Sequence, residues 1–546
     1  MVESRERYSM KLNDQGGITV TLALMIPVIL LLLLVLLEGI HASFGKERLC
    51  DQFLMAQESV LADYDPFLWQ EYHILAVDET YHTDSSAMLS RMLKQYAQEE
   101  GTSSLKGISA NYPYTIEQIA VTDSVSLLEE GVLENEIRAY MAKSVTKDVL
   151  LQAFTDWNQD QKQQITSVKE EMEACEKEAA SQKEQKGGKE TESEKESADQ
   201  TMQTETKDPR KELNKVRRKG LLSFVSGRED WSKEPYDLQA LEDSIKKQWD
   251  SREEIAEDES IMKFDKTEDV TSHLKQSWDK QSVTEEVLTK AAVALYAGEH
   301  FSNMVQAVER TSGNDTKAKE KEQTQEEGQG MQCQLEYLLC GKQSDYDNAN
   351  SIVHRLVAVR FPVNFAYAAT APDLVAEANA VAAELVGATL NPAAIEVTAY
   401  LLLAAESYAE AMLDVRKLLH GGRVSYLKNA SNFKISLKNL PMVLQEVLTE
   451  NETKNSQKQD NSEQGLSYAD YLGMLLFLQP QQVQCRRMLC VMEKRGQQSR
   501  TSFALSHMLF AFQAEEKAVL APVFLKLPFS DFHKGYTMTF RKVISY

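Results

Sequence analysis

The stretch ITVTLALMIPVILLLLLVLL, residues 18–37, runs for twenty positions without a charged side chain. At about 1.5 Å per residue, a helix of that length just crosses the roughly 30 Å hydrocarbon layer of a membrane. Pro27 lies within the run, where it removes one backbone hydrogen bond and is expected to bend the helix. The stretch therefore predicts a single transmembrane helix, with membrane lipid as its first partner.

The flanks of this run favour a retained anchor over a cleaved secretory signal. A signal has a shorter apolar region followed by a small-residue cleavage site, and here only Ala42 offers one. Basic residues stand on both sides, three before the run and two just after it: Arg5, Arg7 and Lys11, then Lys46 and Arg48. By the positive-inside rule we expect residues 1–17 in the cytoplasm, one pass through the cell membrane, and the C-terminal bulk of the chain outside the cell.

The helix is expected to continue beyond the membrane. Leu49, Phe53, Ala56 and Val60 recur at helical spacing, which places them on one face of a helix. The span should therefore run on to about Asp63 as an amphipathic stem, whose apolar stripe packs on the outer part of the protein.

The composition excludes some classes of partner. Of the 546 residues, 42% are hydrophobic, enough for two to four folded units of ordinary domain size. The net charge is -23, whereas binding to nucleic acids or to anionic lipid surfaces requires clustered basic residues. We therefore expect no nucleic-acid partner.

The cysteines point to no special chemistry. There are six, and none of them stands in a CxxC spacing, so neither a zinc site nor a disulfide-built scaffold is predicted. Because the count is even, one or two disulfides stay open as alternatives, between Cys333 and Cys340 or between Cys485 and Cys490.

Three stretches rich in Glu, Lys, Gln and Ser divide the part beyond the anchor. Residues 158–212, for example, contain no Phe, Trp, Tyr or Leu and cannot bury enough apolar surface to offset the entropy of the chain. We predict disordered charged linkers at 158–218, 310–332 and 449–465. Around them we expect a stem helix with a membrane-proximal α/β region at 38–157, a helical region at 219–309, a helical domain at 333–448, and a C-terminal helix with a β-hairpin region at 466–546.

Local patterns assign elements to these regions. Asn391 as N-cap, Pro392 at the first helical position and Gly421 just past the end bound a long helix. Its most apolar part, 397–405, is too short for a second span. Alternating residues predict a short strand at 72–77, a sheet edge at 114–119, and an antiparallel pair of strands near 519–523 and 536–541. The predicted fold class is α+β, mainly helical.

Motifs for catalysis or cofactor binding are missing from the sequence. It contains no GxGxxG, GxxxxGK, HExxH, GxSxG or EF-hand pattern. The nine histidines are scattered singly, and only His73 stands near two acids, Asp65 and Asp78. We therefore expect no enzyme, no metal, no cofactor and no small-molecule substrate. An enzyme with an unfamiliar site is the weakest alternative.

The N-terminal order of residues resembles a known family. Paired glycines, an apolar run broken by Pro27, Glu38 at its outer edge and a continuing helix (GGITVTLALMIPVILLLLLVLLEGIHASFGKERLCDQ) resemble the anchor of TadE/TadG-like pilus-assembly proteins. Those are single-span, pilin-like envelope proteins of the tight-adherence secretion system. A longer pattern is similar to an uncharacterised family of large TadE-like proteins of Gram-positive bacteria. It comprises DPFLWQEYHILAVD, EYLLCGKQSDYDNANSIVHRLVAVRFPVNFAY, EAMLDVRKLLHGGRVSYLK and LSYADYLGMLLFL.

The resemblance implies two sites. Glu38, a carboxylate beside hydrocarbon, would pair with the N-terminus or a basic residue of a neighbouring subunit as an assembly contact. The alternative is a Glu38 that is simply solvated among the lipid headgroups. Gly17 would be the residue after which a prepilin-type peptidase cuts, although Leu22 stands where such enzymes prefer a Glu.

The resemblance also implies a function. A stem helix with a terminal sheet matches the pilin-like plan, so we expect a membrane-anchored structural or interaction component of a Tad-type pilus or secretion apparatus. Its partners would be other envelope or pilus-assembly proteins. The alternative is a membrane-tethered binding or sensor module unrelated to pili, whose outer helical domain recognises an envelope ligand.

Overall fold

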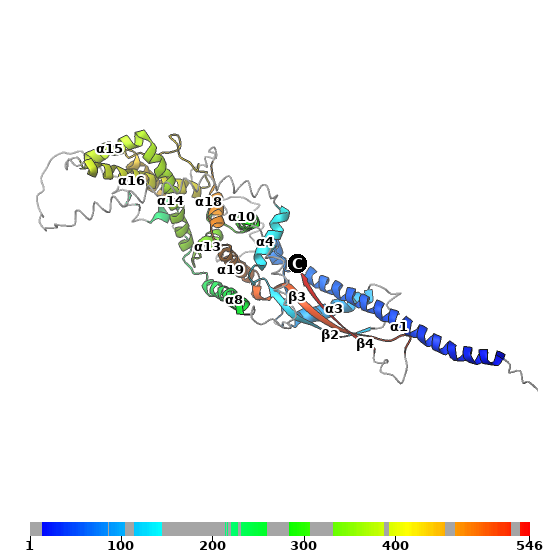
Figure 1. Ribbon diagram of the computed structural model, residues 1–546. Helices are drawn as coiled ribbons and strands as arrows, with labels where there is room; N and C mark the ends of the chain where they lie inside the picture. Colours follow the sequence, from blue (N-terminus) through cyan, green and yellow to red (C-terminus); the bar gives the residue numbers. More distant parts are fainter. Residues whose placement is uncertain are drawn as a thin grey trace, which may run out of the picture. The chain divides into compact units, whose positions relative to one another are not determined.

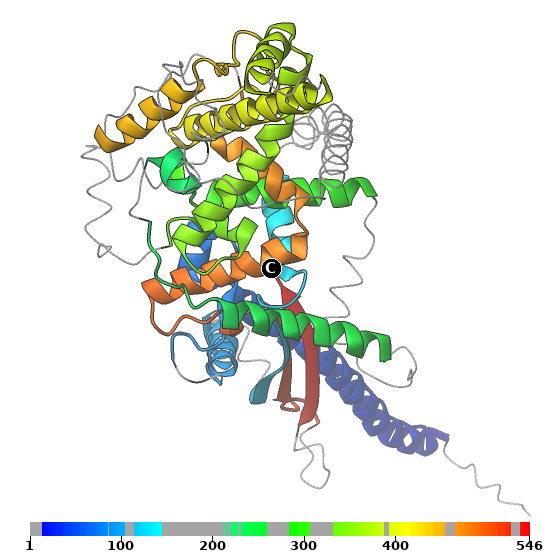
Figure 2. The same cartoon turned by 90° about the vertical axis from the view of Figure 1, so that its left-hand side faces the viewer.

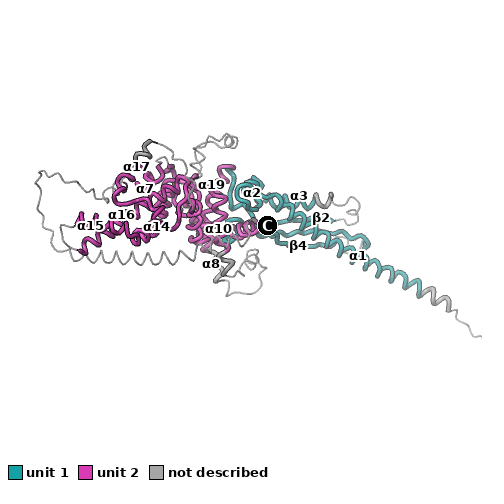
Figure 3. Tube along the Cα trace, turned by 90° about the horizontal axis from the view of Figure 1, so that it is seen from above, with its two compact units in different colours: residues 1–132, 260–280, 500–546 teal, residues 133–259, 281–499 magenta. Residues whose placement is uncertain are grey.

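The protein is described here from a computed structural model, in which two compact units are distinguished (Figure 3). The described residues are 14–83, 85, 87–103, 114–144, 213, 216, 220–227, 231–258, 283–305, 331–386, 392–453, 465–525 and 535–546. Unit 1 draws its described residues from 1–132 and 500–546, and unit 2 from 133–259 and 281–499. Most elements are helices, and a small antiparallel sheet uses the C-terminal residues, which confirms the predicted fold class.

Unit 1 begins with one long helix, α1 (Asp14–Ala62), of 49 residues (Figure 1). Nearly all side chains from 21 to 37 are exposed, and this part of α1 is long and apolar enough to cross a membrane. Beyond it the predicted stripe of Leu49, Phe53, Ala56 and Val60 is buried to 2% exposure or less. The continuation of the span into an amphipathic stem is therefore confirmed.

The C-terminal half of α1 packs on an antiparallel sheet. Strand β3 (Met508–Leu520) is its centre, with β2 (Tyr114–Ser126) paired along one edge and β4 (Tyr536–Ser545) along the other. Alternate residues of β3, such as Phe512, Ala514 and Ala518, share one apolar core with α1 and with α3 (Met88–Ser103). The predicted C-terminal strand pair and the sheet edge at 114–119 are confirmed, but β3 ends at Leu520, so only the first two residues of the strand predicted near 519–523 belong to it.

The strand predicted at 72–77 is wrong over most of its length. Asp65 accepts hydrogen bonds from the backbone N–H groups of Phe67 and Leu68 and so caps a short helix, α2 (Pro66–Tyr72). Strand β1 is reduced to Val77–Asp78, which pairs with β3. An Asp N-cap followed by Pro is a strong signal for a helix start. The helix ends at Tyr72, where His73 takes a left-handed conformation, and residues 73–76 form neither helix nor strand. A 3₁₀ turn, η4 (Leu505–His507), leads into β3.

The regular elements of unit 2 are helices. They are α4 (Val132–Ser144, whose first residue is assigned to unit 1), α7 (Leu221–Ser226), α8 (Gln239–Asp258), α10 (Val283–His300), α13 (Gln334–Cys340), α14 (Asp345–Thr370), α15 (Pro372–Val386), α16 (Pro392–Leu419), α17 (Leu440–Thr453), α18 (Tyr468–Leu478) and α19 (Gln481–Ser499).

Helices α14, α15 and α16 lie side by side in both views (Figures 1 and 2). Small residues such as Ala378, Ala382 and Ala399 are buried between them, which allows the backbones to approach closely. As predicted, α16 begins at Pro392 and ends just before Gly421, whose φ is 78°. Asn391, its predicted N-cap, lies outside the described residues.

The units divide the chain differently from the predicted regions. The C-terminal region 466–546 is shared, because α18 and α19 belong to unit 2 and the strands belong to unit 1. Of the predicted linkers, 158–218 and 310–332 lie almost entirely outside the described residues. The third, 449–465, begins as helix, since α17 continues to Thr453.

Candidate assembly site

Glu38 lies at the point where α1 leaves its exposed apolar run. Glu38 is only 2% exposed. The alternative of a Glu38 solvated among the lipid headgroups is therefore not supported. The carboxylate accepts hydrogen bonds from three successive backbone N–H groups, those of Val523 (3.2 Å), Phe524 (2.6 Å) and Leu525 (3.0 Å). The Nδ1 atom of His41, one turn along α1, is 3.5 Å from the carboxylate.

This contact explains how an acid can be buried beside the apolar run. A buried carboxylate is costly unless hydrogen bonds replace its water shell, and bonds from N–H groups to a charged acceptor are among the stronger ones in proteins. Glu38 thus holds the segment that follows β3 against α1. These partners belong to the segment of the same chain that follows β3, and pairing of Glu38 with a neighbouring subunit stays a prediction.

The same junction is closely packed at Gly45. A Cβ atom at Gly45 would collide with the side chain of Leu520, the last residue of β3. Leu520 is fully buried, so α1 and the end of β3 are in close contact two turns beyond Glu38. Gly17, the other site residue predicted from the sequence, lies in the first turns of α1, and its cleavage stays a prediction.

The sequence placed Asp65 and Asp78 near His73, but in the structure both carboxylates lie beside Arg500. Arg500 Nη2 is 2.9 Å from Asp65 and 3.9 Å from Asp78. Asp78 also contacts His82, at 3.0 Å. His73 is the C-cap of α2, with a φ of 53°, and packs edge-on against the ring of Trp69. The cluster joins α2 and β1 to Arg500, the first residue of the segment 500–546 of unit 1. Its contacts hold these parts of the fold together.

Unit 2 contains a buried network of charges that sequence reasoning missed. Arg360 of α14 is fully buried, and its guanidinium contacts Asp414 of α16 at 2.9 Å. Lys428 bridges Asp414 and Glu410, each at 2.7 Å. Asn364 donates to Asp414 at 3.0 Å. The two cations and two carboxylates balance, so the network fixes α14, α16 and the loop after α16 without a net buried charge.

One buried acid lies beside this network without joining it. Glu406 is 1% exposed, and neither of its carboxylate oxygens has a hydrogen-bond partner within the described residues. Burial, with the nearby charges of Glu377 and Glu410, raises the pKa of Glu406 to about 8. The carboxyl group is therefore mainly protonated at neutral pH.

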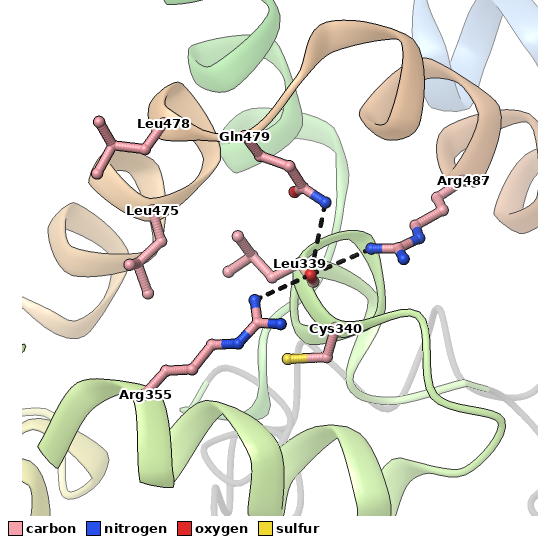
Figure 4. Close-up of a pocket in the computed structure, with 7 residues that line it drawn as sticks. All are labelled: Leu339, Cys340, Arg355, Leu475, Leu478, Gln479 and Arg487. Atoms are coloured by element: carbon pink, nitrogen blue, oxygen red, sulfur yellow. Dashed lines mark hydrogen bonds between the residues drawn. The ribbon is translucent and has the colours of Figure 1, made fainter. Parts of the chain in front are cut away.

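A hollow of about 350 Å³ opens near the C-terminus of α13 (Figure 4). Arg355, Gln479 and Arg487 converge on the carbonyl oxygen of Leu339, at 3.1, 3.5 and 3.1 Å. The remaining lining comes from Leu339, Cys340, Leu475 and Leu478. None of the described acidic side chains lines the hollow, although Arg487 pairs with Glu242 at 3.2 Å, and the wall combines two guanidinium groups with apolar surface.

The described residues offer no metal centre and no disulfide. Among them, no group of three or more His, Cys, Asp and Glu side chains could hold a metal ion. The five described cysteines are free thiols, so neither of the disulfides left open by the sequence is formed. Four of them, Cys333, Cys340, Cys485 and Cys490, are buried in unit 2.

Fold and site together define a class of protein. It is a mainly helical α+β protein, and its one N-terminal helix is long and apolar enough to cross a membrane and continues into the core of a small sheet. Residues 199–519, more than half of the chain, match the model of DUF5702, a family of unknown function. The protein belongs to this family. The match begins beyond α1 and ends within β3. No curated protein and no solved structure matches the chain.

Proposed function

We propose that the protein is a membrane-anchored, pilin-like structural and interaction component of a Tad-type pilus or secretion apparatus at the cell envelope. The observation that carries this proposal is the double role of α1. Its first part is an exposed apolar run, and its second part forms the core of the sheet in unit 1. Anchor and folded unit are thus one continuous element, the arrangement expected of a pilin-like subunit.

The chemistry of the described residues supports a scaffold. The charged side chains of the buried network in unit 2 contact one another across α14, α16 and the following loop, where they fix structure. Glu38 and Arg500 likewise join elements of unit 1. Partners would be other apparatus subunits, which contact the apolar run within the membrane or the helices of unit 2 outside it.

Co-purification from native membranes tests this proposal. The full chain, tagged at its C-terminus, should recover a Tad-type secretion ATPase, platform protein or pilin after mild detergent extraction. A matched control carries an unrelated apolar span in place of residues 18–37. Subunits that the control still recovers are recognised outside the membrane, and subunits that it loses are recognised within it. Recovery of none of these subunits with the native chain would contradict the proposal.

One observation favours the alternative of a membrane-tethered binding module. Arg355 is exposed and donates to the carbonyl of Leu339, within a hollow that none of the described acids lines. A guanidinium beside Leu475 and Leu478 suits a ligand with an acidic group and an apolar part. Equilibrium binding of acidic cell-wall peptides to the full chain tests this, with Arg355→Ala as the variant and Arg423→Ala, in the loop after α16, as control. Equal binding by both variants would exclude the hollow as the site.

A further inference from the structure

We infer that the segment after β3 that Glu38 holds, together with the adjoining part of α1, is a second membrane contact, seated among the lipid headgroups beside the transmembrane helix. The contact consists of Ile40, Phe44 and the segment 523–525, which we term the collar. The inference rests on the proposed membrane anchorage of α1 and goes beyond it, because it places part of the folded unit in the bilayer interface.

Geometry places the collar at the membrane boundary. Glu38 directly follows the apolar run, and its three hydrogen bonds hold residues 523–525 at the same level along α1. At the helical rise, Ile40 and Phe44 lie about 3 and 9 Å further along the axis. The interfacial layer on each side of the hydrocarbon is about 5–8 Å thick. With the run in the hydrocarbon, Ile40 and Phe524 fall within this layer, and Phe44 lies just beyond it.

The collar presents large apolar side chains outward. Ile40 is 53% exposed, Phe44 58% and Phe524 43%, whereas His41 and Gly45, which face the sheet, are buried. Phe524 is also fixed, since its backbone N–H is bound to Glu38 and its ring packs edge-on against His41. Apolar groups in a fixed position at this depth lose water-exposed area when they enter the interface.

The charge pattern favours an apolar contact with lipid over an electrostatic one. Lys46 and Glu47, the exposed charged residues next to Phe44, balance each other. The chain as a whole carries a net charge of -23, which opposes attraction to anionic headgroups. The collar is continuous with the transmembrane run, so lipid is its occupant, and the contact should form equally well in zwitterionic membranes.

Depth-dependent fluorescence quenching tests the inference on the full chain in phosphatidylcholine vesicles. The probe is tryptophan introduced by Phe524→Trp, read as emission added to that of the five native tryptophans. The control is Val543→Trp, a similarly exposed apolar site on β4 (39%), paired with Gln513 and roughly 30 Å from residue 523 along the strand direction. Circular dichroism verifies that each variant is folded.

We expect lipids brominated near the headgroup to quench the added emission of Phe524→Trp at least twofold more than that of Val543→Trp. Leu30→Trp, within the apolar run, reports the anchor itself and should be quenched best by deeply brominated lipids. If Leu30→Trp is quenched and Phe524→Trp is not, the collar is wrong and the anchor stands. If Leu30→Trp is not quenched either, the anchorage itself fails. The added emission of Phe524→Trp could instead change with protein concentration and not with brominated lipid. That result would identify a second copy of the chain as the occupant and would also overturn the inference.

Discussion

At the scale of the residue, removing one member of the buried charge network should strongly destabilise unit 2. Asp414 neutralises both Arg360 and Lys428, so Asp414→Asn leaves two buried cations with only Glu410 to compensate them. Loss of one member of a buried charged group typically costs about 3–5 kcal/mol. Unfolding of the detergent-solubilised full chain by urea, followed through its helical signal, should show this loss.

Glu396→Gln is the matched control for this change, because Glu396 is an exposed acid on the same helix. Exposed substitutions of this kind shift stability by about 0.5 kcal/mol or less. If Asp414→Asn were as stable as Glu396→Gln, the network would contribute nothing and the account of unit 2 would be wrong.

Glu406 should make the stability of unit 2 depend on pH. Burial raises its pKa in the folded chain from 4.5 to about 8. Between these values the folded state holds a proton that the unfolded state has lost, so stability decreases as pH rises from about 4.5 to about 8. Replacing the acid by an apolar side chain of similar length, Glu406→Met, removes this decrease. At pH 7 the variant should be more stable by up to about 3 kcal/mol.

The measurement is the difference in melting temperature between Glu406→Met and the native chain from pH 5 to pH 8. We expect this difference to grow steadily in favour of the variant as pH rises. A difference that is constant over this range would mean that Glu406 titrates normally in the folded protein.

At the scale of the element, α1 should stabilise unit 1 through its buried face alone. Phe53 is fully buried against the sheet, and Met55, two residues on, is 50% exposed. Phe53→Ala should cost about 3–5 kcal/mol through lost burial and a cavity, and Met55→Ala should cost far less. Limited proteolysis of the full chain in detergent compares the two, with cleavage of β2 or β3 as the readout. Equal protection in both variants would show that the stem is not packed on the sheet.

The elements differ in how much of them the sequence predicts. Helix α1 and its stripe are predictable because a continuous apolar run and a helical period are local signals. The alternation at 72–77 is misleading, because α2 runs to Tyr72 and ends in a left-handed cap at His73, which leaves only Val77 of this stretch paired in the sheet. The ends of β3 could not be located in the sequence, since its apolar residues pair with β2, almost four hundred residues earlier in the chain.

The Glu38 site and the buried charge network also differ in how much of them the sequence predicts. Glu38 stands out in the sequence because a lone acid ends an apolar run, but its actual partners, the amides of 523–525, come from the other end of the chain. The contact between Arg360 and Asp414 joins residues more than fifty positions apart on two helices. Neither pairing has a local signature, because both are formed only by tertiary packing.

At the scale of the whole molecule, the central claim is a single anchor near the N-terminus with residues 38–546 outside the cell. The apolar run, the stem and the acidic composition all agree with it. The amides that bind Glu38 come from the C-terminal part of unit 1, so the last strands must lie on the same side of the membrane as the stem.

Protease accessibility of a C-terminal epitope tag tests this claim most directly. The full chain is expressed in its native host, cell walls are removed, and intact protoplasts are treated with proteinase K beside a cytosolic marker. We predict that the tag is lost while the marker survives, and that the chain remains with the membrane after alkaline extraction. A tag that stays protected until detergent opens the membrane would place the folded units in the cytoplasm and contradict the account.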